Sequence, residues 1–405
     1  MTPITLDVLF SHKHNPYPLY TQLREQGPLT HFSWSGMDMW IVTTYEDTLA
    51  ILKDPRFTLD RHKASMGQQR SLMESASPSP YTPLAGMRHL LNSDPPNHTR
   101  LRTLVSKAFT PRMVEQLRPR IQQITDELLD DVQSQGQMDL IADFAFPLPI
   151  IVISEMLGIP TTYRQQFRAW TQTIVQAINP KPEKQAAGKA AEAAFIEYIT
   201  TLIAQKRGHP DEDLISGLVQ SEEQGDNLSA NELIAMILLL ITAGHETTVN
   251  LIGNGMLALL EQEEQMRLLR ANPELLPSAI EELLRYTAPV SLSSPRWACE
   301  DITFHGKMIR KGEMVRCALL AANTDPQQCA DPTTLDILRQ ENQHVAFGKG
   351  IHFCLGAPLA RLEGQIAIGT LLHRFPHLRL ASDPEQLAWQ EGGSLRILAA
   401  LPVRF

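Results

Sequence analysis

The stretch FGKGIHFCLG, residues 347–356, holds one cysteine in a glycine-framed loop that leads straight into a helical pattern. Gly348 and Gly350 allow backbone conformations closed to other residues, and Gly356 leaves room for a large flat group beside the helix start. The first amide groups of that helix would stabilise negative charge on Cys354. The loop thus indicates that Cys354 is a thiolate ligand to a metal and that a planar cofactor binds beside it. The alternative is that Cys354 is a small buried hydrophobic residue, which is the more common role of a lone cysteine.

The composition is that of an ordinary soluble globular protein. The chain has 405 residues, of which 43% are hydrophobic and 20% charged. No Gly/Ser- or Pro-rich linker and no internal repeat divides it, so we expect one large domain over residues 1–405. The 36 basic and 45 acidic residues give a net charge of -9, which argues against nucleic acid or an anionic membrane as a general partner.

The cysteines favour a reducing compartment. Cys299, Cys317, Cys329 and Cys354 form no C-x-x-C pair, and no His/Cys cluster has zinc-finger spacing, which argues against structural zinc. The N-terminal residues lack a signal-peptide core or an anchor helix. We therefore expect a cytoplasmic monomer, although nothing in the sequence excludes a dimer.

Helical patterns dominate, so the expected fold is mainly α with a small β region. The long apolar segment 233–260 is interrupted by His245 and Glu246, which favours a buried core helix over a membrane span. Helices are expected at about 16–26, 45–53, 95–108, 111–134, 142–157, 161–178, 185–206, 229–261, 263–270, 275–287 and 355–374. Strands are expected at 29–43, 290–297, 302–309, 314–318 and 395–405.

Two segments have the composition of lids or of plain connections. Residues 55–92 carry several prolines and methionines, and residues 179–188 carry two prolines between helical patterns. The sequence does not say whether either segment is open or closed at rest.

The long central helix contains Ala243-Gly244-His245-Glu246-Thr247-Thr248, which places polar groups inside an apolar element. Gly244 weakens the helix locally, and the Thr247 hydroxyl can compete for a backbone carbonyl one turn back. Glu246 and Thr247 form an acid and alcohol pair suited to passing protons. The alternative is a polar pair that only joins two helices.

Glu282 and Arg285 lie one turn apart on one face of a predicted helix. Such a pair is usually a weak surface contact. Here apolar neighbours predict partial burial, and Arg339, fifteen residues before Cys354, is the candidate third partner. A buried triad would fix the segment that carries Cys354.

Four further groups could bind two carboxylates, such as the two propionates of a haem. His98 and Arg102 share a helix face, His352 lies two residues before Cys354, and Arg296 lies in a predicted strand. The alternative for His98 and Arg102 is two exposed polar residues on an amphipathic helix.

Together these residues resemble the cytochrome P450 superfamily, the haem-thiolate monooxygenases, and specifically its soluble bacterial members. The resemblance spans nearly the whole chain and implies a haem b between the long central helix and the helix after the cysteine loop. It implies that Cys354 is the axial ligand of the iron. The residues expected to contact the cofactor are His98, Arg102, Ala243, Gly244, Arg296, Phe347, Gly348, His352, Cys354 and Gly356.

The resemblance also implies the remaining roles. Thr247 would hold dioxygen and its water network while Glu246 helps to deliver protons; Glu282, Arg285 and Arg339 would be structural. Electrons would come from a ferredoxin and its reductase, or a flavodoxin, because the haem fold uses the whole chain. Candidate docking contacts are Lys107, Arg112 and Arg361, which could equally be ordinary surface charges.

The resemblance places mostly apolar side chains around a hydrophobic small-molecule substrate, such as a fatty acid, terpenoid, steroid or polyketide. They are Leu84, Met87, Leu90, Leu239, Leu240, Val290, Leu292, Ser293 and Leu395. Plain core packing is the alternative for each of them. Thr324 and Cys329 depart from residues common in relatives, which puts partner docking or local packing in question.

Two other functions remain open at this point. A peroxide-driven peroxygenase usually lacks the acid and alcohol pair, which Glu246 and Thr247 retain here. A non-catalytic haem-binding protein would have no need of those residues. The sequence therefore favours an O2-activating monooxygenase over both.

Overall fold

A computed structural model of the chain describes residues 4–5, 8–9, 14–34, 37–64, 87–107, 109–176, 182–223, 228–390 and 393–405. The chain divides into two compact units. Unit 1 comprises residues 1–76, 125–145 and 247–405, and unit 2 comprises residues 77–124 and 146–246. The expectation of one domain over the whole chain stays a prediction.

A five-stranded sheet forms one part of unit 1. Its strand order is β1-β2-β8-β5-β3. All neighbours are antiparallel except β2 and β8, which run parallel. The strands are β1 (Leu29–Trp34), β2 (Met37–Val42), β3 (Phe57–Thr58), β5 (Arg296–Ala298) and β8 (Met314–Cys317). Side chains alternate across such strands, and Trp40, Val42, Val315 and Cys317 join one buried cluster with helix α3 (Tyr45–Lys53).

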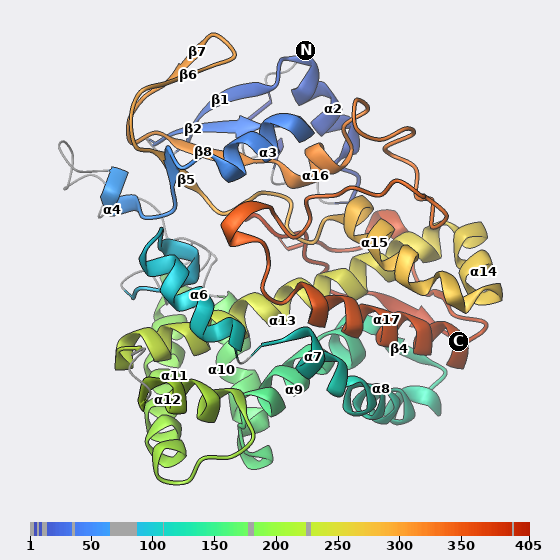
Figure 1. Cartoon of the computed structure of the whole chain (residues 1–405). Helices are drawn as coiled ribbons and strands as arrows, with labels where there is room; N and C mark the ends of the chain where they lie inside the picture. The colour runs from blue at the N-terminus through green and yellow to red at the C-terminus, as the bar shows by residue number, and fades with distance from the viewer. Residues whose placement is uncertain are drawn as a thin grey trace. The chain divides into compact units, whose positions relative to one another are not determined.

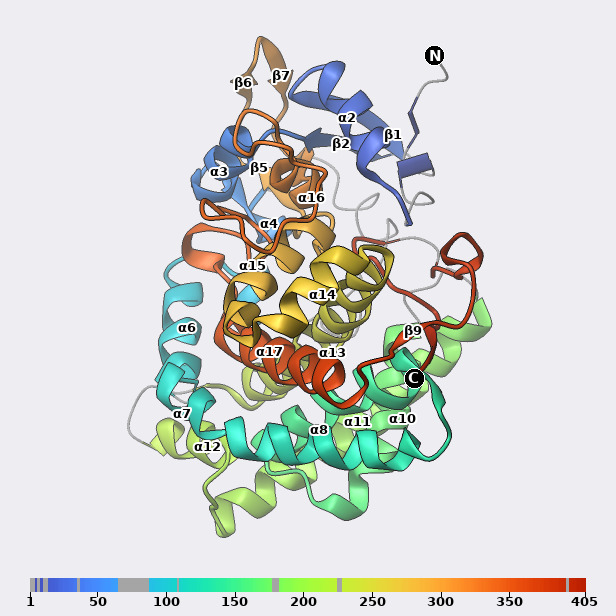
Figure 2. The same cartoon turned by 90° about the vertical axis from the view of Figure 1, so that its right-hand side faces the viewer.

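Two smaller sheets complete the β structure of the described part of unit 1. One pairs β4 (Gln137–Asp139), β10 (Pro402–Arg404) and β9 (Arg379–Leu380), and the other is the hairpin of β6 (Ile302–Phe304) and β7 (Lys307–Ile309). The helices are α2 (Tyr17–Glu25), α3, α4 (Arg61–Ala64), α14 (Glu263–Ala271), α15 (Leu276–Thr287), α16 (Leu319–Asn323) and α17 (Ala357–Arg374). Helices α15 and α17 lie side by side in both views (Figures 1 and 2).

Unit 2 is helical in its described residues. It contains α6 (Asn97–Lys107), α7 (Pro111–Gln116), α9 (Pro147–Met156), α10 (Arg164–Gln176), α11 (Pro182–Gly208) and α12 (Leu214–Glu223). Helix α8 (Arg118–Gln133) and helix α13 (Ala230–Glu261) each contribute residues to both units. Helix α11 packs on α10 and α12 through Phe195 and other apolar side chains.

Helix α13 begins at a capping box. Ser229 Oγ accepts a hydrogen bond from the Glu232 amide at 3.2 Å, and the Glu232 carboxylate accepts one from the Ser229 amide at 2.9 Å. Among the described residues α13 is the one helix long and apolar enough to cross a membrane, yet 67% of its apolar window is buried inside the protein. This burial supports the interpretation of α13 as a core helix.

The fold class, mainly α with small sheets, is confirmed, but several element boundaries were wrong. The expected strand 29–43 is a hairpin of two strands, and the expected strand 290–297 is regular only from Arg296, with isolated bridges at Val290 and Leu292. The tail is a strand only at β10. Helices α12 and α16 and strands β3, β4 and β9 were not expected.

Candidate functional site

The cysteine loop belongs to unit 1 and has two left-handed glycines. Gly348 has φ +67 and Gly350 has φ +78, as the sequence indicated, and a Cβ on Gly350 would lie 2.9 Å from the Leu52 carbonyl oxygen. The Cys354 amide donates to the Phe347 carbonyl at 3.0 Å. The backbone therefore fixes the position of Cys354 relative to Phe347.

Helix α17 begins at Ala357, two residues later than expected, with Gly356 as its N-cap. Cys354 is half-buried, and a Cβ on Gly356 would lie 3.9 Å from its Sγ atom. Ile351 and Phe353 are among the exposed large hydrophobic residues of the described chain. A half-buried thiol in a rigid loop at a helix start is a suitable metal ligand.

The structure brings together Glu282, Arg285 and Arg339, the three residues grouped by the sequence analysis. Arg285 Nε and Nη2 each lie 2.7 Å from a Glu282 oxygen, and Arg339 Nε lies 3.3 Å from the same carboxylate. Both members of the pair are 1% exposed in their side chains. Arg285 also donates to the carbonyls of Asn323 and Pro332. The cluster joins α15 to the chain that leads to the cysteine loop.

Two other predicted haem contacts lie in unit 1. Arg296, on β5, is buried, and its Nη1 lies 3.5 Å from the Phe57 carbonyl oxygen. His352 is half-buried in a single helical turn, Gly350–His352, and lies two residues before the cysteine. Both therefore stand on short elements of the unit that carries Cys354.

The polar motif lies on an unbroken part of α13. Glu246 is 7% exposed, and burial raises its pKa to about 7. His245 is also buried; its Nε2 lies 3.1 Å from the Phe146 carbonyl, and its ring meets the Phe146 ring edge-on at 4.3 Å. Ala243 and Thr247 are half-buried and Gly244 is exposed. His245 thus joins two helices of unit 2, while its neighbour Glu246 can exchange a proton near neutral pH.

Helix α6 of unit 2 carries His98 and Arg102 on one face, as expected. His98 is 3% exposed, and both its burial and the charge of Arg102 lower its pKa. The alternative that both side chains are exposed does not hold, because Arg102 is half-buried.

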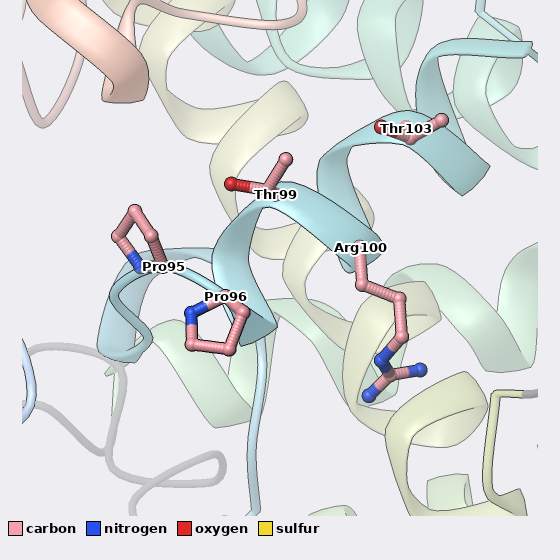
Figure 3. A pocket seen from close by; sticks show the side chains of 5 residues that line it. All are labelled: Pro95, Pro96, Thr99, Arg100 and Thr103. Atoms are coloured by element: carbon pink, nitrogen blue, oxygen red, sulfur yellow. The ribbon is translucent and has the colours of Figure 1, made fainter.

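An open hollow that the sequence did not predict lies along α6 and the turn before it (Figure 3). Its lining comprises Pro95, Pro96, Thr99, Arg100 and Thr103. Arg100 pairs with Glu232 of α13 inside unit 2. The hollow contains none of the predicted site residues.

The predicted substrate-pocket residues that the structure describes are buried or half-buried. Leu90, Leu239, Leu292 and Ser293 are at most 7% exposed. Met87, Leu240, Val290 and Leu395 are half-buried. Val290 and Leu395 face each other in a β-bridge. The Ser293 hydroxyl accepts from the Cys317 amide at 2.9 Å and donates to the Ser294 carbonyl at 3.1 Å. The Ser293 hydroxyl is thus engaged by the backbone.

Leu84 lies outside the described residues, as do 65–86 and 179–181 of the two expected lids.

The two residues that depart from those common in relatives, and the three candidate docking contacts, differ in their exposure and in their partners. Thr324 is 1% exposed and donates to the Leu320 carbonyl at 2.8 Å, so its effect is on local packing. Cys329 is half-buried. Lys107 and Arg112 are exposed on unit 2, whereas Arg361 is paired with Glu281 in unit 1.

The cytochrome P450 family matches residues 2–397 of the chain. Cytochrome P450 CYP107DY1 of Priestia megaterium is 53% identical over 413 residues and covers 100% of both chains. The crystal structure of myxobacterial cytochrome P450 CYP267B1 in complex with myristic acid has a TM-score of 0.90 at 44% identity, covering 98% of each chain. The bacillaene polyketide synthase cytochrome P450 PksS of Bacillus subtilis 168 has a TM-score of 0.89 at 42% identity, covering 97% of each chain.

The chain therefore belongs to the cytochrome P450 family and has its fold. It is an oxidoreductase of the monooxygenase type, which binds haem iron and uses O2. Among these relatives, the CYP267B1 structure contains myristic acid, and PksS is named for a polyketide synthase. These findings confirm the resemblance inferred from the sequence.

Sequence reasoning missed three buried or half-buried polar residues of unit 1. Glu281 and His344 form a cluster with Arg361, and Glu363 is 2% exposed on α17. Glu281 precedes Glu282, and Glu363 lies nine residues after Cys354. Acidic residues at apolar positions of a helix were the signal that could have found Glu363.

Proposed function

We propose that Cys354 supplies the axial thiolate of a haem b, and that the protein oxidises a hydrophobic acyl compound with O2 and two electrons from separate proteins. The observation that carries this proposal is the buried Glu246, whose pKa of about 7 lets it take up and release a proton at neutral pH. A non-catalytic haem protein would not need such a group, and peroxide-driven relatives usually lack the acid and alcohol pair that Glu246 and Thr247 form here. The acid lies directly before Thr247 on α13.

The residues of unit 1 fit a haem with a thiolate ligand. The two left-handed glycines and the Cys354 to Phe347 hydrogen bond present the sulfur on a rigid loop. Gly356 lies beside the sulfur, where a Cβ would be in ordinary van der Waals contact with it at 3.9 Å. When bound, the haem supplies O2 activation, with the thiolate favouring O–O cleavage.

The chain's own residues would contribute binding and proton transfer. We assign propionate binding to Arg296 and His352 of unit 1 and, from the resemblance, to His98 and Arg102 of unit 2. Glu246 would pass a proton towards the Thr247 hydroxyl, which would hold it at the position of O2. The apolar side chains predicted to line the substrate site would exclude water from it.

The proposed substrate class rests on the apolar residues and on two of the solved relatives. The structure of CYP267B1 contains myristic acid, and PksS belongs to a polyketide synthase system. We therefore propose fatty acids and polyketide chains as the substrate class, in preference to terpenoids and steroids. A ferredoxin with its reductase, or a flavodoxin, would donate the electrons in the cytoplasm, and we propose that the protein acts as a monomer.

The ligand assignment is tested with Cys354→Ala. We expect this variant to lose the carbon-monoxide difference band at the position typical of a haem-thiolate, while Cys329→Ala keeps it. A band that survives in Cys354→Ala shows that the ligand assignment is wrong.

The proton pathway is tested with Thr247→Ala and Glu246→Gln. Both variants should bind haem and substrate but divert reducing equivalents from product to peroxide, with Glu246→Gln also losing the dependence of turnover on a group that titrates near pH 7. The assay compares cofactor consumed, product formed and peroxide released. Unchanged coupling would refute the assigned roles, and turnover faster with peroxide than with a reduced ferredoxin would support a peroxygenase.

The substrate class is tested by a spectral-shift screen, because displacement of water from the iron reports ligands that enter the site. Saturated fatty acids and macrolactones are compared with terpenoids and steroids of equal carbon number. Shifts confined to the terpenoids or steroids contradict the proposed class.

A further inference from the structure

A compact charged cluster lies behind the cysteine loop in unit 1. Glu281 lies on α15 and Arg361 on α17, two helices that pack against each other. His344 lies on the segment that leads into the cysteine loop, and Phe347 is the first residue of that loop. The roles proposed above assign no function to Glu281 or His344.

The Glu281 carboxylate is held from two directions. Arg361 Nε lies 2.6 Å from Oε1 and Arg361 Nη2 lies 2.7 Å from Oε2, which is the bidentate geometry of a strong ion pair. His344 Nε2 lies 3.2 Å from Oε2, and the Ala346 amide donates to His344 Nδ1 at 3.2 Å. The His344 proton is therefore on Nε2 and donates to Glu281. Burial alone would raise the pKa of Glu281, but these two partners hold it at about 2.

The same arginine reaches the cysteine loop. Its guanidinium carbon lies 4.6 Å from the centre of the Phe347 ring. The Phe347 carbonyl in turn accepts the hydrogen bond from the Cys354 amide at 3.0 Å. The hydrogen bond to Glu281 raises the pKa of Arg361, against the effect of its partial burial. The charged guanidinium therefore lies over the ring of the residue whose carbonyl holds the Cys354 amide.

We infer that Arg361 and Glu281 are a pair of opposite charges that sets how strongly the Cys354 sulfur donates electrons, and hence the reduction potential of the haem. This inference rests on the proposed ligand role of Cys354. A cation near the sulfur withdraws electron density and favours the reduced iron, whereas the Glu281 carboxylate opposes it. Arg361 and Glu281 are positioning residues, because they act through Cys354 and Phe347.

The test measures the midpoint potential of the haem by spectroelectrochemistry in the purified holoprotein. Glu281→Gln leaves the arginine charge unbalanced, so we expect a shift to more positive potential. Arg361→Gln removes the cation, so we expect a shift to more negative potential, and the double variant should lie between the two. Arg361→Lys keeps the charge and should stay nearest to the wild type.

The Arg120–Glu155 pair of unit 2 is a matched control. It has the same bidentate geometry, at 2.8 and 2.7 Å, and similar side-chain exposure, 35% and 22% against 33% and 30%. Its residues belong to α8 and α9, so Glu155→Gln and Arg120→Gln should leave the potential unchanged.

A failure of the proposed ligand role of Cys354 can be told apart from a failure of the inference about the charge pair. A thiolate band that survives in Cys354→Ala overturns the ligand assignment itself. If Cys354→Ala loses the band, but Glu281→Gln and Arg361→Gln shift the potential in the same direction or leave it unchanged, only the inference about the charge pair is wrong. A purely structural role would lower haem content in both variants without shifts of opposite sign.

Discussion

Replacing Glu282 by Gln removes the charge that balances a cation in the core. The Glu282 carboxylate accepts two hydrogen bonds from Arg285 at 2.7 Å, one from the Asp336 amide at 2.9 Å and one from Asn342 at 3.0 Å. Both ionised side chains are 1% exposed. Removing one partner of such a buried pair costs about 3–5 kcal/mol, because the other charge is left uncompensated. Glu282→Gln should therefore lower the free energy of unfolding by about 3–5 kcal/mol.

The assay is equilibrium urea unfolding, followed by circular dichroism and by haem absorbance at equal haem occupancy. The chain contains its own control in Glu115, on α7, and Arg118, the first residue of α8. They have the same spacing of three residues but are 62% and 46% exposed. Glu115→Gln should leave the unfolding free energy within experimental error, because water screens that pair. Equal losses in Glu282→Gln and Glu115→Gln would refute the reasoning that burial gives the pair its importance.

Two further predictions concern other residues of unit 1. Burial raises the pKa of Glu363 from 4.5 to about 8, so the native state holds its proton more tightly than the unfolded chain does, and stability falls as pH rises through this range. This carboxyl should lower the free energy of unfolding by about 1.4 kcal/mol per pH unit, and Glu363→Gln should remove that contribution. Urea unfolding measured at several pH values tests this; an unchanged pH dependence in the variant contradicts a raised pKa for Glu363. Gly350→Ala should destabilise the cysteine loop more than Gly348→Ala, because both glycines are left-handed but only at Gly350 would a Cβ meet the Leu52 carbonyl oxygen, at 2.9 Å. Thermal denaturation compares the two variants, and equal loss would show that the close contact is unimportant.

Much of the site could be predicted because its signals are local. Gly348 and Gly350 stood out in the sequence as residues that permit left-handed conformations, and the structure places both there. Glu246 was visible as an acid within an apolar helix. Its pKa was not, because burial depends on which side chains pack around it in the folded chain.

The missed features depend on neighbours that are distant in sequence. The partners of Glu282 beyond Arg339 include Asn342 and the Asp336 amide, and no spacing rule links residues so far apart in the chain. Strand β3 has two residues and strand β4 has three, too few to show an alternating pattern. Helix α12 does carry paired apolar positions, so its omission was a failure to use an available signal.

The parallel pairing of β2 with β8 has a consequence for synthesis in the cell. Strand β2 ends at Val42, and its partner β8 ends at Cys317, about 275 residues later. At about 5–20 residues per second, a ribosome needs roughly 14–55 seconds to make that interval. During this time one hydrogen-bonding edge of β2 has no native partner, and an open strand edge can pair with other chains. The nascent protein thus has a period of exposure to aggregation that ends only when the last quarter of the chain emerges, and slower translation would lengthen it.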